Sequence, residues 1–355
     1  IYNIDGYLNR GSYSRANQNG PEQYGFRGNA KNLDLNRDFI KADAQNTISF
    51  QQIFQQWKPD ILIDNHVSDG ADYQYTMTLI ATQRNKLHPL VSEYMDKKLV
   101  PGLYVDMIKL GNPICPYVET MGETPESGIV GFMESPRFAT GYAALFNCIG
   151  FVPETHMLKP YNDRVWSTYD LMTMIINRAS ADADEIVRLH KAADQAVITQ
   201  KEFVISWKLD TGKYELFEFR GYEAKHVTSK VSGLPVLWYD RSKPYTKEIR
   251  FYNWYVPVTT VNKPDVYIIP QAWTEVIYRL QINGVKMRRL IRDTTLSAGF
   301  YHIDFVKHPS APYESHYNHR GTKTTESTQR VAFYKGDYVI EKNQSCNRYL
   351  VEVLD

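Results

Sequence analysis

The sequence predicts an α/β fold, with a mixed, buried sheet flanked by helices, followed by a β-rich second domain. In residues 1–199, segments with helical periodicity alternate with short apolar runs, which is typical of a sheet buried between helices. From residue 200 onward, runs rich in β-branched and aromatic residues are separated by Gly, Pro and Lys. A length of 355 residues fits about two domains. We therefore expect two domains, at 1–199 and 200–355.

The first domain is expected to begin with loops and then to alternate helices with a short strand. Residues 1–38 are polar and rich in Gly, Asn and Arg, which indicates a loop-rich surface. Apolar residues recur at helical spacing over 47–57, 86–100 and 162–196, so we expect helices there. The apolar run Ile61–Ile63 is bounded by turn residues and predicts a strand buried on both faces.

A second buried strand is expected shortly before residue 156. The segment 143–152 is largely apolar, and we interpret it as a helix end, a turn at Gly150 and a strand. This strand delivers Glu154. Because α/β proteins place their sites at the carboxyl ends of buried strands, the polar residues after both strands are candidates for function.

The second domain is expected to consist mainly of strands. One helix interrupts them over about 273–280, and Gly284 is able to cap its end. The strands are predicted from runs of β-branched and aromatic residues bounded by turns. They cover residues 203–207, 214–219, 249–252, 331–334 and 349–353.

Composition excludes several classes of protein. The chain has 41 Lys and Arg against 40 Asp and Glu, and a net charge of +1 argues against nonspecific binding to nucleic acid or to an anionic membrane. No apolar run approaches the roughly 18 residues of a transmembrane segment. The three cysteines lack metal-binding spacing, so we expect buried or free thiols. The sequence contains no Gly-rich phosphate loop and no Gly-x-Ser-x-Gly motif, which argues against nucleotide binding and serine hydrolysis.

Four polar clusters in the first 160 residues carry the candidate chemistry. Taken singly, each has an ordinary structural explanation, since Asp-Gly is usually a turn and an Asn-Arg pair is usually part of a solvated loop. Their order along the chain makes them informative as a set. The clusters are Asp5-Gly6, Asp34-Leu35-Asn36-Arg37, Asp64-Asn65-His66 and Glu154.

In this order the clusters resemble the zinc carboxypeptidases of the carboxypeptidase A type, over about residues 1–195. The resemblance implies that His66 is a zinc ligand and that Glu154 is the general base and acid. It also implies that Asn36 and Arg37 bind the terminal carboxylate of a substrate. The residue types suit these roles, because a guanidinium binds a carboxylate bidentately and a carboxylate accepts a proton from water.

Three further residues receive roles from the same resemblance. Arg15 would polarise the scissile carbonyl and stabilise the developing oxyanion, with Arg10 and Arg27 as nearby competitors. Tyr142 is the candidate for a mobile tyrosine that covers the substrate. Arg137 is expected to meet an acidic group of the substrate or to pair with a surface carboxylate.

The chain departs from the family pattern in its zinc ligands. The family takes two ligands from a His-x-x-Glu motif upstream of the Asp-Gly turn, and none of the nine histidines here has Glu three residues later. Either the motif lies before Ile1, which the abrupt start favours, or the metal has been lost. Because zinc sites need three or four protein ligands, we expect the chain with His66 alone to bind zinc weakly or not at all and to be inactive.

The resemblance implies zinc-dependent hydrolysis of a peptide or amide bond next to a free C-terminal carboxylate. The expected partner is a peptide substrate with a free C-terminus, and the implied location is secreted or periplasmic, although no signal peptide is visible. Two alternatives stay open. One is a deacylase of amino-acid conjugates, and the other is a noncatalytic peptide- or carboxylate-binding protein that retains Asn36 and Arg37.

Overall fold

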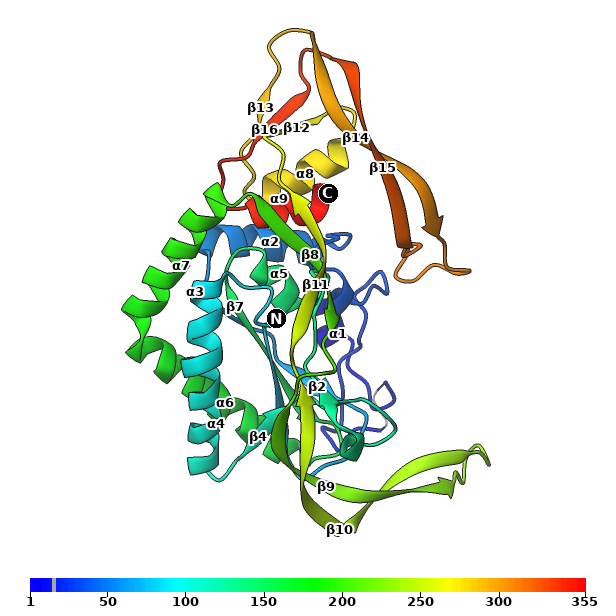
Figure 1. Cartoon of the computed structure of the whole chain (residues 1–355). Helices are drawn as coiled ribbons and strands as arrows, with labels where there is room; N and C mark the ends of the chain where they lie inside the picture. The colour runs from blue at the N-terminus through cyan, green and yellow to red at the C-terminus, as the bar shows by residue number, and fades with distance from the viewer. Residues whose placement is uncertain (15–16) are drawn as a thin grey trace.

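The centre of the molecule is a five-stranded mixed sheet (Figure 1), seen in a computed structural model that describes residues 1–14 and 17–355. The strand order is β1-β7-β3-β4, and β2 also pairs with β7. Strands β1 and β2 run parallel to β7, whereas β3 runs antiparallel to it. The α/β prediction for the first part of the chain is confirmed. The strands are β1 Ile61–Ile63, β2 His66–Ser68, β3 Met77–Ala81, β4 Ile114–Pro116 and β7 Ile149–His156.

Strand β7 is the buried middle strand of the sheet, and it pairs with β1, β2 and β3. All eight of its residues are buried. Its partner on one side is interrupted, because β1 pairs with residues 149–151 and β2 pairs with residues 154–156. Pro153 lies opposite this interruption, where a proline that lacks a donor N–H costs the sheet no ladder bond on that side.

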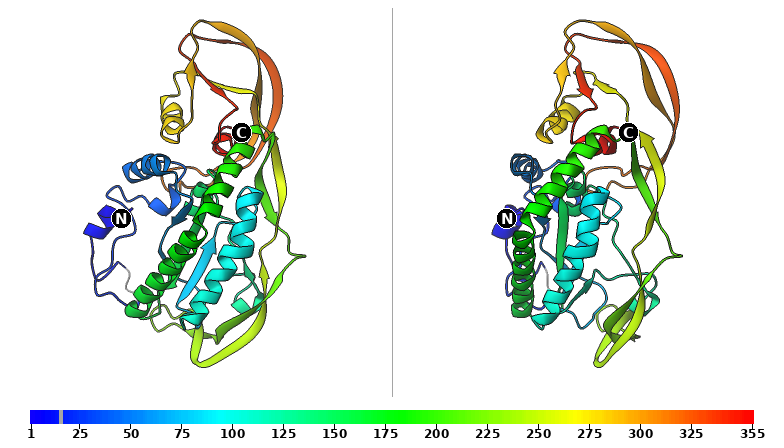
Figure 2. Two further views of the ribbon diagram at one scale, coloured as in Figure 1. Left: turned by 90° about the vertical axis from the view of Figure 1, so that its left-hand side faces the viewer. Right: turned by 60° about the vertical axis from the view of Figure 1, so that its left-hand side comes forward.

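Two layers of helices cover the sheet, and β1 divides its side chains between them. Ile61 and Ile63 pack on one hydrophobic cluster and Leu62 packs on the other, as the two-residue period of a strand requires. On the first side, long helices lie side by side over the sheet (Figure 2). These are α3 Pro89–Tyr94, a π-helical turn Met95–Leu99, α4 Val100–Lys109, α6 Tyr161–Ala181 and α7 Ala183–Thr199; on the other side lie α2 Gln45–Trp57 and α5 Ala139–Ala144.

Two details of the first part differ from the predictions. The helix expected over 86–100 continues to Lys109, because the Pro101 ring is accommodated in the first turn of α4. Gly150 lies inside β7 rather than in a turn, which falls instead at Asn147, with φ 56°. A side chain at position 150 would meet α5, since an added Cβ would lie 2.8 Å from the Cα of Thr140.

The second part of the chain is rich in strands that stay out of the central sheet. They form four smaller sheets, one of which includes β5 Glu119–Thr120 and β6 Ile129–Val130. The hairpins β9–β10 and β14–β15 extend as long arms at opposite ends of the molecule (Figure 1). The strands are β8 Glu202–Leu209, β9 Glu215–Thr228, β10 Pro235–Tyr252, β11 Tyr255–Asn262, β12 Val266–Ile269, β13 Arg288–Arg289, β14 Thr294–Lys307, β15 Arg320–Phe333 and β16 Tyr338–Glu341.

Two helices accompany these strands, one expected and one not. Helix α8, Thr274–Ile282, is followed by Gly284 with φ 77°, which confirms the predicted helix and its glycine end. The strand predicted over 349–353 is wrong, because these residues belong to α9, Asn347–Leu354. Arg348 and Glu352 pair at 2.9 Å across one helical turn, and the apolar run packs against several elements at once, which the strand-like sequence pattern did not reveal.

The two parts of the chain share a hydrophobic cluster. This cluster combines Phe39, Phe54 and Tyr142 from the first part with Ile277 and Leu350 from the second. The division at 199 and 200 stays a prediction. The remaining short helices are α1 Ile4–Leu8 and the 3-10 turns η1 Leu35–Arg37 and η3 Pro125–Ser127.

Two further expectations concern thiols and membranes. Cys115, Cys148 and Cys346 are buried free cysteines, as predicted. Within residues 1–14 and 17–355, no helix combines the length and the apolar character that crossing a bilayer requires.

The close approach of α5 to β7 yields a stability prediction. Gly150→Ala should lower the free energy of unfolding by about 2 kcal/mol, because the new methyl group overpacks against the backbone of α5. Gly299→Ala is the matched control, since Gly299 also lies in a strand and an added Cβ there would meet nothing within 4 Å. Urea denaturation of both variants checks the difference. Equal stability of the two variants would contradict the packing described for β7.

Candidate functional site

The site is built on the pairing of β2 with β7. In the parallel register His66 lies opposite Glu154, and Nδ1 of His66 is 3.6 Å from Oε1 of Glu154. The other ring nitrogen, Nε2, is 2.9 Å from Oδ2 of Asp64, the first residue of the break between β1 and β2. The imidazole is therefore held between two carboxylates at the carboxyl end of a buried strand, where the sequence predicted a site.

The pKa values of His66 and Glu154 are both raised, for different reasons. Burial lowers the pKa of His66, but the hydrogen bond that its ring donates to Asp64 and the charges of Asp64, Glu154 and Glu134 outweigh burial and raise the pKa to about 9. Burial raises the pKa of Glu154 to about 7, against the opposing charge of His66. Its Oε2 atom is buried without a hydrogen-bond partner among the described residues. The arrangement keeps a carboxylate free to exchange a proton near neutral pH.

Glu134 is a second buried carboxylate beside this pair. It is 6% exposed, and it accepts a hydrogen bond from the backbone N–H of Thr140 at 3.1 Å, at the start of α5. Burial raises its pKa to about 7, and the charges of His66 and Glu154 also act on it. Sequence reasoning missed Glu134, because nothing in the Glu-Ser-Pro segment distinguishes a buried glutamate from a surface one. It missed the role of Asp64 as well, although the spacing Asp-x-His after a strand was a usable signal.

His66 and Asp64 face an open cleft of about 700 Å³. Asn36 lines this cleft, so the structure brings Asn36 and His66 to the same cavity. Arg27 also lines the cleft, and its guanidinium pairs with Asp34 at 2.8 Å. The chain segments that form the walls lie far apart in sequence: residues 2–3, 18–27, 34–36, 64–67, 155 and 161–168.

Arg37 lies in a different cavity from Asn36. It lines a smaller pocket of about 340 Å³ together with Arg137. The guanidinium carbons of Arg37 and Arg137 lie 4.7 Å and 5.1 Å from the centroid of the Phe138 ring. The sequence grouped Arg37 and Arg137 as substrate-binding residues, and the structure does bring these two together. Consecutive residues of η1 thus point into two neighbouring cavities.

Tyr142 does not lie at the cleft, which corrects its expected position. It is fully buried, and its hydroxyl donates to Oδ1 of Asn283 at 2.7 Å. Its ring contacts Phe54 and Phe146 at centroid distances of 5.3 Å and 5.4 Å. A side chain packed in this way belongs to the core and does not cover a substrate. Arg15, the expected carbonyl-polarising residue, lies outside the described residues.

The described residues supply one candidate metal ligand. His66 has the features of a zinc ligand, since a carboxylate holds one ring nitrogen as it does in many metal sites. Within residues 1–14 and 17–355, however, no three His, Cys, Asp or Glu side chains gather into a group that could hold a metal ion. These residues therefore do not form a zinc site by themselves.

Comparison with known proteins reveals distant similarity to fungal carboxypeptidases. The chain is 22% identical over 287 residues to carboxypeptidase 2 of Trichophyton rubrum, which covers 74% of this chain and 48% of that protein. It is 21% identical over 335 residues to probable carboxypeptidase 2 of Arthroderma benhamiae, covering 89% of this chain and 60% of that protein. It is 21% identical over 345 residues to carboxypeptidase 2 of Trichophyton equinum, covering 89% and 58%.

The chain therefore spans about half to three fifths of the length of these relatives. No family model matches it, and no solved structure matches it. The names of these relatives agree with the resemblance to carboxypeptidases. The metal and the roles of individual residues stay proposals.

The buried Glu134 yields a pH-dependent prediction. Its pKa is raised from 4.5 to about 7, so the folded chain keeps this proton where the unfolded chain has lost it, and stability falls between these pH values. Glu134→Gln removes this loss and still accepts the Thr140 N–H. We expect the variant to be more stable than the parent by roughly 3 kcal/mol at pH 8 and nearly equal to it at pH 4.5.

Urea denaturation at both pH values is the measurement. Glu248→Gln is the control, because Glu248 is an exposed glutamate in β10. A gain at pH 4.5 as large as that at pH 8 would show that burial of the charge is not the cause.

Proposed function

We propose that the cleft beside His66 binds a peptide with a free C-terminus and hydrolyses its last amide bond. The observation that carries the proposal is the pairing of β2 with β7, which sets the Glu154 carboxylate 3.6 Å from His66. Asn36 lines the same cleft. The names of the distant relatives support peptidase activity.

Glu154 takes the role of general base and then general acid. Its Oε2 atom is buried and has no hydrogen-bond partner among the described residues. Glu154 is not among the residues that line the cleft, so the attacking water would have to enter beside His66 to give its proton to this oxygen. A pKa raised to about 7 by burial suits this role, because a base works best when its pKa is near the working pH. The proton would then pass to the leaving amine.

His66 takes the role of one zinc ligand, with Asp64 orienting its ring. The remaining ligands would come from outside the described residues. A zinc ion bound there would act as a Lewis acid and lower the pKa of water to about 7. Nearby carboxylates raise the pKa of His66 to about 9 despite its burial, so the ring is protonated at neutral pH. A metal would have to displace that proton to bind the ring.

Asn36 and Arg37 would hold the terminal carboxylate of the substrate. Asn36 lines the cleft, and Arg37, the next residue, lines the neighbouring pocket, so a chain end held by both residues would lie where the two cavities approach each other. This pairing would set the scissile bond at a fixed distance from the chain end. The role of Arg15 as the group that polarises the carbonyl rests on the resemblance alone, as does a secreted or periplasmic location.

A noncatalytic function is the second candidate. The observation that favours it is the lack of a three-ligand metal group among residues 1–14 and 17–355. Such a protein would bind a peptide or carboxylate through Asn36 and Arg37 without cleaving it. A deacylase of amino-acid conjugates would use the same residues on a shorter substrate.

The test measures zinc content and the release of a C-terminal amino acid from peptides. The 355-residue chain should bind zinc weakly and release nothing, because it supplies one ligand of the three or four that zinc needs. A longer form of the protein that carries His-x-x-Glu upstream should bind one zinc ion per chain and hydrolyse peptides.

In that longer form, Glu154→Gln should keep the zinc and lower turnover by about 100-fold or more, because Gln accepts no proton. Glu248→Gln is the matched control and should leave turnover unchanged. Undiminished turnover in Glu154→Gln would remove the role given to Glu154. Stoichiometric zinc held through His66 in the 355-residue chain would refute the argument from ligand count.

A further inference from the structure

Arg37 and Arg137 form a pair of guanidinium groups on one aromatic ring. They lie 4.7 Å and 5.1 Å from the centroid of Phe138 and face the same pocket of about 340 Å³. The backbone joins their segments, because the N–H of Phe39 donates to the carbonyl of Arg137 at 3.2 Å. The pair is thus a fixed feature of two loops that pack together and is not a chance approach of surface side chains.

Neither guanidinium has a carboxylate partner. Across residues 1–14 and 17–355, no Asp or Glu oxygen lies within 4.0 Å of a side-chain nitrogen of Arg37 or Arg137. The Arg37 Nη1 atom donates to the carbonyl of Asn36 at 2.7 Å, and its Nε atom is buried without a partner. Two cations that share a pocket repel each other, so an anion between them would be stabilised by both.

Two of the other charged groups of the pocket, Lys41 and Glu352, are already paired. Lys41 lies 3.2 Å from Asp43, and Glu352 lies 2.9 Å from Arg348. The Glu314 carboxylate accepts a hydrogen bond from the backbone N–H of Asp34 at 2.8 Å. A backbone N–H leaves the charge of Glu314 in place, so the charges without an ionic partner are those of Arg37, Arg137 and Glu314, and their sum is positive.

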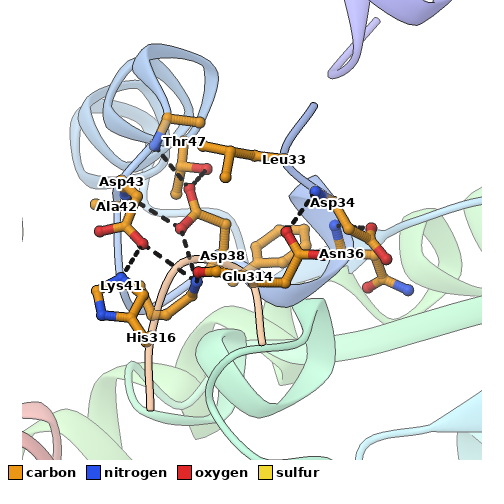
Figure 3. Close-up of polar contacts among 12 residues, drawn as sticks. Leu33, Asp34, Asn36, Asp38, Lys41, Ala42, Asp43, Thr47, Glu314 and His316 are labelled. Carbon is orange, nitrogen blue, oxygen red and sulfur yellow. Dashed lines mark hydrogen bonds and ion pairs between the residues drawn. The ribbon is translucent and has the colours of Figure 1, made fainter. Parts of the chain in front are cut away.

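The tip of the β14–β15 hairpin, residues 308–319, closes the pocket from the side of the second domain. Figure 3 shows Glu314 and His316 of this tip against the segment that follows η1. His316 Nε2 lies 2.6 Å from Oδ2 of Asp43. Tyr313 places its ring centroid 5.7 Å from the Arg137 guanidinium, which therefore contacts the rings of both Tyr313 and Phe138. These contacts hold Arg137 in place before any ligand arrives.

We propose that this pocket binds the side-chain carboxylate of a substrate's last residue, so that the preferred peptides end in Glu or Asp. The inference rests on the proposed function, because Arg37 would hold the terminal carboxylate while Arg137 meets the side chain. The pocket is at the small end of the range for ligand pockets, which suits one side chain. A neutral side chain of the same shape is rejected, since it would leave Arg137 unpaired in the pocket.

The test compares binding of two ligands of nearly the same shape by isothermal titration calorimetry. N-acetyl-L-glutamate carries both carboxylates, and N-acetyl-L-glutamine lacks the one on the side chain. The 355-residue chain should bind N-acetyl-L-glutamate about tenfold more tightly or better, which is the gain expected from a hydrogen bond to a charged group. No metal and no turnover are needed for this measurement.

Variants assign the difference to individual residues. Arg137→Gln should remove the preference and leave binding of N-acetyl-L-glutamine unchanged, Arg137→Lys should keep part of it, and Arg37→Gln should weaken both ligands. Arg292→Gln is the control, because Arg292 is exposed and far from the pocket in sequence. Circular dichroism checks that each variant is folded.

Each outcome decides the inference. Equal binding of both ligands to the parent chain would overturn the acidic preference while leaving the terminal-carboxylate role of Asn36 and Arg37 intact. A preference that survives in Arg137→Gln would overturn the assignment to this pocket. Failure of both ligands to bind would overturn the pocket as a carboxylate site, whereas failure of the proposed hydrolysis would appear separately, in the zinc and peptide-release assays.

Discussion

The parallel pairing of β2 with β7 is the constraint on which the candidate site depends. The register sets His66 opposite Glu154, and a slip of one residue would turn one of the two side chains to the other face of the sheet. Burial of all eight residues of β7 fixes that register, because the strand packs on both sides. At the break after Ile63 the Asp64 N–H still donates to the Phe151 carbonyl at 2.9 Å while its carboxylate reaches the His66 ring, and Pro153 lies opposite that break without disturbing it. The backbone pairing of β2 with β7 therefore determines where the side chains of the candidate site lie.

A second buried carboxylate positions the binding residues. Asp38 accepts hydrogen bonds from the N–H groups of Asp43 and Ala44 at 3.1 Å and 3.0 Å and from the Thr47 hydroxyl at 2.5 Å. It thereby ties the loop that follows η1 to the first turn of α2 through the Thr47 hydroxyl. Because η1 immediately precedes Asp38, this anchoring also orients Asn36 and Arg37. The tip of β14–β15 packs on the same loop, so the second part of the chain helps to shape the site (Figure 3).

Local patterns predicted most of the fold, and the failures occurred where distant contacts decide. Periodicity was sufficient for α2, whose buried residues Thr47, Gln51 and Phe54 recur at helical spacing, and a short apolar run was sufficient for β1, although its three residues are half-buried and not buried on both faces as predicted. The run at 349–353 has the apolar character of a strand but belongs to α9. Its buried side chains pack on helices and on a strand that lie elsewhere in the sequence, and these contacts are not visible in the local pattern. The segment Asp34–Arg37 suggested one binding site for Asn36 and Arg37, but their division between two cavities depends on Arg137 and the hairpin tip. Tyr142 was expected at the substrate, and no local signal showed that aromatic rings from α2 and from the segments around Phe39 and Phe146 enclose it.

The juxtaposition of His66 and Glu154 is the central claim, and an NMR titration of the His66 ring tests it most directly. Isotope-labelled protein would be titrated from pH 5 to pH 10, as the parent chain and as Glu154→Gln. The account predicts a pKa near 9 for His66 in the parent, because Asp64 and Glu154 flank the ring, and a lower pKa once the Glu154 charge is removed. A pKa for His66 that is the same in both proteins would contradict the account, because it would mean that Glu154 does not face this histidine.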